Sequence, residues 1–169
     1  YIPIPQDGGR ITVIETPYDS DIIILQKRID ETVIPYGTDN EQSEVREKMS
    51  TKSEAPEAVQ IENSKFYSKR TISKEVITGG GDLVGDINNG VISLETIDDE
   101  ELPKELQGLS PSEQQTYIDK KLKTRKELED TMSKLIKKHD GYVAKKTKEV
   151  AKPDSFDNAV KETLREQLY

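Results

Sequence analysis

A stretch of about forty residues, Ser110 to Lys152, predicts one long charged helix and constrains the fold more than any other part of the sequence. Its start, Ser110-Pro111-Ser112-Glu113, combines a capping serine, a proline suited to the first helical position and a glutamate that completes a capping box. Pro153 ends it, because proline lacks the N–H that a helix interior requires. Only Gly141 disfavours the helix, by about 1 kcal/mol. We therefore expect a mainly α fold built around this element.

Large residues recur along the second half of this helix at alternating steps of three and four. They are Leu128, Met132, Leu135, His139 and Tyr142. Such a 3.5-residue period is typical of a coiled-coil seam, but Arg125 and Lys146 at the flanking seam positions leave only about two heptads. We expect an antiparallel hairpin with another segment of the same chain rather than a long dimeric coiled coil. Leu128, Met132 and Leu135 are the candidate partner-binding residues.

Composition narrows the classes of function. The net charge is −8 and the sequence pI is about 4.9, so the chain repels phosphate backbones and nucleic-acid binding is not expected. Charged residues (34%) outnumber hydrophobic ones (32%), which predicts a thin core and an extended shape. No apolar run approaches the roughly 20 residues of a membrane-spanning helix. Cysteine is absent, which excludes disulfides and thiolate metal sites.

The first part of the chain predicts a small β-hairpin and a helix. Residues Tyr1 to Glu15 alternate around Asp7-Gly8-Gly9, a turn that glycine favours. A helix should follow from Thr16-Pro17-Tyr18-Asp19 to about Val33. Its apolar face carries Ile22, Leu25, Ile29 and Val33, and Ile24 lies off this face, which predicts burial on two sides. The chain begins at Tyr1 rather than Met, and we expect it to be a piece of a longer protein.

The middle of the chain is more polar. From Thr38 to Arg70 it has weak helical character on both sides of Pro56, which predicts a mobile linker helix. Asp82 can cap a short helix that runs to Asn88 and ends at Asn89-Gly90. A final helix should begin at Asp154-Ser155-Phe156-Asp157.

Two motifs in the middle of the chain share some features with ligand-binding loops. Residues 79–85 share only their glycine content with a phosphate loop, and we interpret them as a break and helix cap. The segment from Asp86 to Asp98 resembles a calcium loop, but Gly90 arrives one residue early and Ile97 stands at the twelfth position, where calcium needs glutamate. A calcium-binding module using this loop is the alternative function. No residue is assigned as catalytic, cofactor-binding or metal-ligating.

Several short motifs, taken in their order along the chain, resemble those of a known family. The first group is Tyr1-Ile2-Pro3-Ile4-Pro5-Gln6-Asp7-Gly8-Gly9, Thr16-Pro17-Tyr18-Asp19 and Val33-Ile34-Pro35-Tyr36-Gly37. The second group is residues 79–83, Glu101-Leu102-Pro103-Lys104-Glu105-Leu106, Leu109-Ser110-Pro111-Ser112-Glu113 and Asp154-Ser155-Phe156-Asp157. In this order they resemble the C-terminal part of bacterial von Willebrand factor type A (VWA) domain proteins.

The resemblance implies an organisation and a role. Residues 1–37 would be the C-terminal edge of a VWA-like α/β domain, and residues 38–169 a helical C-terminal extension. The family binds a divalent metal through an Asp-x-Ser-x-Ser loop that this chain lacks, so we expect no cofactor here and a metal only in an upstream part. The expected function is a non-enzymatic protein-interaction or support module whose partners are proteins, including the upstream VWA domain. The resemblance implies a periplasmic or extracellular location.

Overall fold

The structure, a computed structural model, describes residues 14–69, 76–77 and 79–150. These residues form five α-helices and two short 3-10 helices, with one isolated β-bridge between Pro35 and Asp82 and no β-strand. The expectation of a mainly α fold is thus confirmed. The hairpin predicted for Tyr1 to Glu15 falls outside the described residues, apart from its last two, which form no strand. The final helix predicted from Asp154 also lies outside them.

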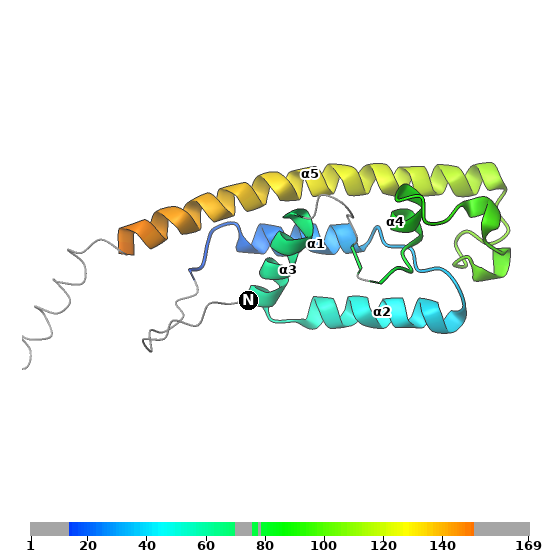
Figure 1. Ribbon diagram of the computed structural model, residues 1–169, viewed down its shortest axis with the longest axis horizontal. Coiled ribbons are helices and arrows are strands. Elements are labelled where there is room, and N and C mark those ends of the chain that lie inside the picture. The colour runs from blue at the N-terminus through cyan, green and yellow to red at the C-terminus, as the bar shows by residue number, and fades with distance from the viewer. Residues whose placement is uncertain (1–13, 70–75, 78, 151–169) are drawn as a thin grey trace, which may run out of the picture.

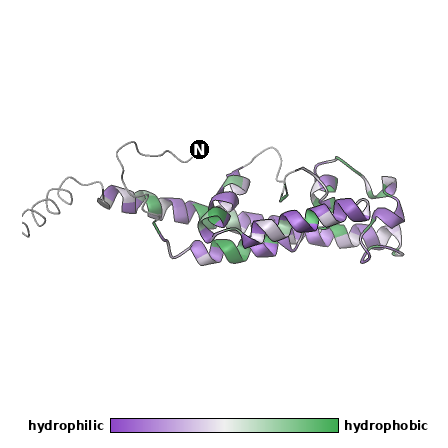
Figure 2. Ribbon diagram, turned by 90° about the horizontal axis from the view of Figure 1, so that it is seen from below, coloured by the Kyte–Doolittle hydropathy of each residue, from purple (hydrophilic) through white to green (hydrophobic). Residues whose placement is uncertain are grey.

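The helices are arranged around one element that runs the length of the molecule (Figure 1). They are α1 (Asp19–Asp30), α2 (Asp39–Glu54), α3 (Glu57–Lys69), α4 (Leu83–Asn88), η1 (Leu94–Thr96), η2 (Asp99–Glu101) and α5 (Pro111–Val150). α5 forms one long edge and α2 the opposite edge, with α1 between them. Hydrophilic residues dominate the helix surfaces, and hydrophobic ones occupy short patches (Figure 2).

α5 is the long helix that the sequence predicts. Its 40 residues correspond to about 60 Å at 1.5 Å per residue. The Ser110 hydroxyl accepts a hydrogen bond from the Glu113 N–H at 3.4 Å, and the Glu113 carboxylate accepts one from the Ser110 N–H at 2.9 Å. Hydrogen bonds from Ser110 lower the pKa of Glu113. The predicted capping box is therefore confirmed, and Gly141 does not interrupt the helix.

α1 begins where the sequence places it but ends at Asp30, before Val33. Ile22 and Ile29 of its apolar face are buried, at 0% and 4% exposed. Ile24 is 55% exposed, so the expectation of burial on two sides is wrong. With its neighbour Ile23 only partly buried, this helix buries a single stripe.

Buried apolar residues form two clusters that share α5 but no residue. The first joins α1, α3 and α5 and comprises Ile22, Ile29, Ile61, Val76, Leu128, Met132 and Ile136. The second lies at the start of α5 and comprises Ile34, Leu83, Val84, Ile97, Leu102, Leu106 and Ile118. α5 is thus a spine with one core near its first turns and another further along.

The segment expected to be a linker helix is two helices. α2 starts at a Thr38–Glu41 capping box and is followed by Pro56, after which α3 begins. Helical character on both sides of Pro56 is confirmed. α3 is more than a linker, because Ile61 belongs to the first core cluster and the helix packs on both α1 and α5.

Candidate functional site

The candidate partner-binding residues lie in the chain's own core. Leu128 and Met132 are 6% and 2% exposed, and both pack in the first core cluster with Ile22 and Ile29 of α1. Leu135 is half-buried against the same cluster. The structure therefore places two of these three side chains where a partner protein cannot reach them without opening the core.

α1 and α5 form the antiparallel pair that the seam predicts. Asp19, at the start of α1, lies 3.5 Å from His139 Nε2, whereas Thr32, just after the end of α1, contacts Arg125. Chain direction in α1 therefore opposes that in α5. The hairpin expectation is confirmed, with α1 as the second helix.

Arg125 lies at one end of the contact between α1 and α5, and its role could not be predicted from the sequence. Its side chain is 3% exposed and forms a bidentate pair with Asp82, with Nη1–Oδ2 at 2.6 Å and Nη2–Oδ1 at 3.1 Å. Nε donates to the Thr32 hydroxyl at 2.7 Å, and Nη2 also donates to the Thr32 carbonyl at 2.9 Å. A buried guanidinium needs such partners, because an unpaired charge in the interior is strongly disfavoured.

Asp82 connects this pair to the rest of the fold. Its carboxylate is buried and also accepts from the Ile34 N–H at 3.3 Å, and the Leu83 N–H donates to the Ile34 carbonyl at 2.8 Å. Asp82 precedes α4 as predicted, but its side chain makes no capping hydrogen bond. A Cβ on Gly85 would stand 2.9 Å from Asp82 Oδ2, so the carboxylate can occupy this place only beside glycine.

Asp86 forms a second buried polar contact one turn along α4. It is 8% exposed, and its Oδ2 accepts from the Tyr36 hydroxyl at 3.0 Å and from the Gly81 N–H at 3.1 Å. Burial and the neighbouring Asp86 carboxylate together raise the pKa of Tyr36 to about 12. The same pair therefore ties the segment after α1 to α4.

This pair predicts a specific loss of stability in alkali. Because the folded-state pKa of Tyr36 is raised from 10.0 to about 12, its contribution is fully present below pH 10 and disappears as the pH rises towards 12. We expect one of the seven tyrosines to give a tyrosinate absorbance step near pH 12, and Tyr36→Phe to abolish that step. A Tyr36→Phe protein with an unchanged absorbance titration would contradict the assignment.

The calcium alternative involves this same part of the chain. The Asp86 carboxylate already accepts hydrogen bonds from the Tyr36 hydroxyl and the Gly81 N–H. Asp98 is exposed at the N-cap position of η2 and makes no side-chain capping hydrogen bond. Gly90, at φ +70°, ends α4 in the left-handed conformation that the sequence predicts. Among the described residues, no three histidine, cysteine, aspartate or glutamate side chains are grouped so that they could hold a metal ion.

His139 marks the far end of the α1–α5 contact. It is 5% exposed and lies between two carboxylates, with Nε2 3.5 Å from Asp19 Oδ1 and Nδ1 3.2 Å from Asp140 Oδ1. Asp140 also pairs with Lys69 of α3 at 3.0 Å. Burial alone would raise the pKa of Asp140, but the hydrogen bonds from Lys69 and His139 outweigh it and hold the pKa below its ordinary value. Here too the polar groups join three helices.

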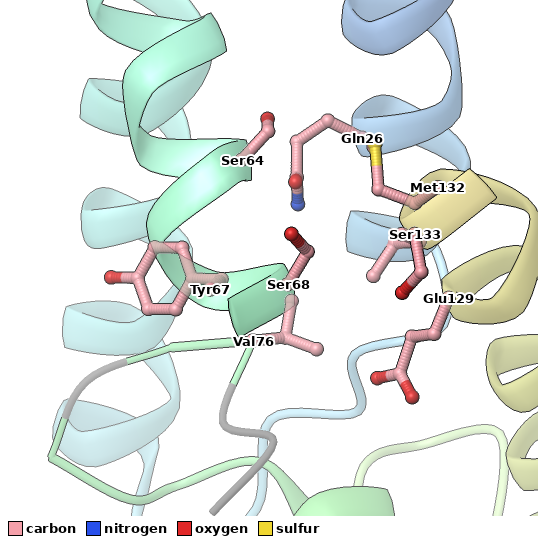
Figure 3. Close-up of a pocket in the computed structure, with 9 residues that line it drawn as sticks. Gln26, Ser64, Tyr67, Ser68, Val76, Glu129, Met132 and Ser133 are labelled. Carbon is pink, nitrogen blue, oxygen red and sulfur yellow. The ribbon is translucent and has the colours of Figure 1, made fainter. Parts of the chain in front are cut away.

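A pocket opens between α1, α3 and α5 (Figure 3). Its cavity volume is small, about 40 Å³, and its lining combines apolar residues with the hydroxyl groups of Ser68 and Ser133 and the carboxylate of Glu129. Gln26 and Ser64, which also line it, are hydrogen-bonded to Asp30 and to the Gln60 carbonyl. The lining includes Ser68 and Val76, which come before and after residues 70–75 in the sequence, and those six residues are outside the described ones.

Comparison with known proteins gives no relative for this chain. No family model, no curated protein and no solved structure matches it. In the part of the chain that the structure describes, none of the helices has the length and apolar character needed to cross a membrane.

Proposed function

We propose that this chain is a non-enzymatic protein-interaction and support module, the C-terminal portion of a VWA-type binding protein. In this proposal residues 1–37 complete the edge of a VWA-like domain and residues 38–169 form the helical extension that holds this edge in place. The ordered motifs described above support the family assignment. The packing of α1 supports the mechanical role.

The contact of α1 with the extension is the observation that carries the proposal. α1 falls within residues 1–37, yet Ile22 and Ile29 are buried against α3 and α5. Burying an isoleucine side chain contributes about 1.5–3 kcal/mol. The last helix of the proposed VWA-like edge therefore depends on the extension for its apolar cover.

Polar contacts also hold α1 against the extension at both of its ends. Asp19 lies beside His139 at the start of α1, and Arg125 holds Thr32 just after its end. These contacts fix the register of α1 along α5, since a shift by one turn would separate both sets of groups. A module that fixes one helix at both ends can transmit force between a domain before α1 and a partner bound to the extension.

The proposal implies a longer protein in which a VWA-like sequence precedes this chain, and it is tested in that protein. That sequence should contain an Asp-x-Ser-x-Ser loop. In the purified protein, Ile22→Lys should expose the α1 face and lower the Tm of the preceding domain by about 10 °C, because several kcal/mol of burial is lost. Calorimetry measures the domain's own transition.

Ile24→Lys is the matched control, because it introduces the same charge two residues away at a position that is 55% exposed. It should leave the Tm of the preceding domain within about 2 °C. Absence of the metal-binding loop upstream would refute the VWA-type assignment. Equal effects of the two substitutions would refute the support role.

A further inference from the structure

The outward face of α5 is covered with lysine. Nine lysines between Lys120 and Lys148 are exposed, and one of these, Lys146, lies over the Tyr142 ring. The other eight occupy the side of the helix opposite the buried stripe that contains Ile118, Arg125 and Met132.

Few carboxylates interrupt this face, which we call the lysine face. The exposed acidic residues of α5 from position 119 to 148 are Asp119, Glu127 and Asp130, so eight lysines against three carboxylates give a net charge of +5. This concentration occurs in a chain whose net charge is −8. Positive charge is therefore gathered on one edge of an acidic molecule.

The opposite edge carries the opposite sign. α2 lies across the molecule from α5 (Figure 1), and its exposed charged residues are Asp39, Glu41, Glu44, Arg46, Glu47, Lys48 and Glu54. These five carboxylates and two cations give a net charge of −3. At physiological salt the Debye length is about 8 Å, so a surface that meets α5 is screened from the acidic edge behind it.

The chemistry of the lysine face selects among anionic partners. Between Asp119 and Lys148 the largest exposed apolar side chain of α5 is Ala144, and no aromatic side chain is exposed there. Protein interfaces are depleted in lysine and are held by buried aromatic or aliphatic anchors. Single-stranded nucleic acids need aromatic platforms. An anionic lipid surface needs neither, because it attracts basic residues as point charges near its headgroups.

The dimensions of the face also fit a lipid surface. From Lys120 to Lys148 the helix rises about 42 Å at 1.5 Å per residue. α5 bows gently, with its convex side away from the other helices (Figure 1). The lysine face, opposite the buried stripe, is therefore directed away from the helices that pack on α5. We propose that the lysine face of α5 binds anionic lipid headgroups at a membrane surface, with the acidic α2 edge directed away from it. This binding is purely electrostatic and reversed by salt, and it does not depend on the support role of the chain.

Flotation with lipid vesicles tests this binding in the purified chain. Vesicles containing 30% phosphatidylglycerol in phosphatidylcholine should carry the protein at 50 mM salt, and pure phosphatidylcholine vesicles should not. Raising the salt to 300 mM should lower the bound fraction about tenfold, because screening shortens the reach of each lysine. The triple variant Lys134→Glu, Lys137→Glu, Lys138→Glu should float no better than background.

A matched variant distinguishes an effect of the lysine face from an effect of the total net charge. Lys27, Lys48 and Lys104 are exposed elsewhere on the molecule, and changing all three to Glu alters the total charge by the same amount. This control should keep at least half of the wild-type bound fraction, and circular dichroism should show that both variants remain helical. Equal loss in the two triple variants would overturn the proposal. So would binding of wild-type protein to neutral vesicles, or retention by a DNA duplex without binding to anionic vesicles.

Discussion

Asp82→Ala should lower the free energy of unfolding by about 3–5 kcal/mol, the cost of leaving a buried charge without its partner. The substitution removes the carboxylate that accepts hydrogen bonds from both terminal nitrogens of Arg125, whose side chain is only 3% exposed. It also removes the acceptor of the Ile34 N–H. Urea denaturation followed by circular dichroism measures the change.

A double-mutant cycle identifies the cause of this loss. Arg125→Met alone should also destabilise the protein, but the double variant with Asp82→Ala should lose clearly less than the sum, because no charge is then left unpaired. Asp130→Ala, an exposed carboxylate on the same helix as Arg125, should stay within about 0.5 kcal/mol of wild type. Additive losses in the cycle would mean that the pair is not coupled.

Ile136→Ala should cost about 2–5 kcal/mol, as expected for truncation of a buried isoleucine that leaves a cavity. Ile136 is 3% exposed and packs with Met132 and the apolar face of α1. Its neighbour Leu135 is only partly buried against this cluster. Leu135→Ala should therefore cost about half as much or less, although the residue removed is of the same size.

Thermal or urea unfolding of the two alanine variants ranks the positions directly. A larger loss for Leu135→Ala would mean that α5 is rotated relative to the arrangement described, with Leu135 rather than Ile136 facing α1. Intact helix content in both variants, measured at low temperature, ensures that the comparison concerns packing rather than loss of α5 itself. The two variants are comparable because Leu135 and Ile136 are of the same size and differ in the face of α5 on which they lie.

The start of α5 could be predicted because the signal for it is local: Ser110 and Glu113 satisfy each other's backbone groups three residues apart. The end predicted at Pro153 lies outside the described residues. The termination of α4 at Gly90 follows from the same kind of signal, a residue that tolerates positive φ.

The role of Arg125 could not be predicted because its partners are distant in sequence. Asp82 lies 43 residues away and Thr32 lies 93 residues away. From the sequence alone, Arg125 limits a hydrophobic seam, and Asp82 is a suitable cap for α4. Only the fold brings them together and converts two surface-like residues into a buried pair.

Leu135 packs against the core cluster but is less buried than Ile136, for a reason of helix geometry. A strict 3.5-residue period steps from Met132 to Leu135, whereas a helix of 3.6 residues per turn drifts by about 20° in each heptad. Packed on the short helix α1 rather than on a long supercoiled partner, α5 keeps its ordinary twist. Ile136 then takes the buried position.

The antiparallel pairing of α1 with α5 has a consequence for synthesis of the chain. Ile22 and Ile29 of α1 leave the ribosome roughly 100 residues before the part of α5 that covers them, and chains grow at about 5–20 residues per second. For roughly 5–20 s, therefore, the apolar face of α1 lacks its cover from α5 and can pack only on α3, which emerges earlier. Until α5 emerges, the part of this face that α3 leaves open is a site for a chaperone.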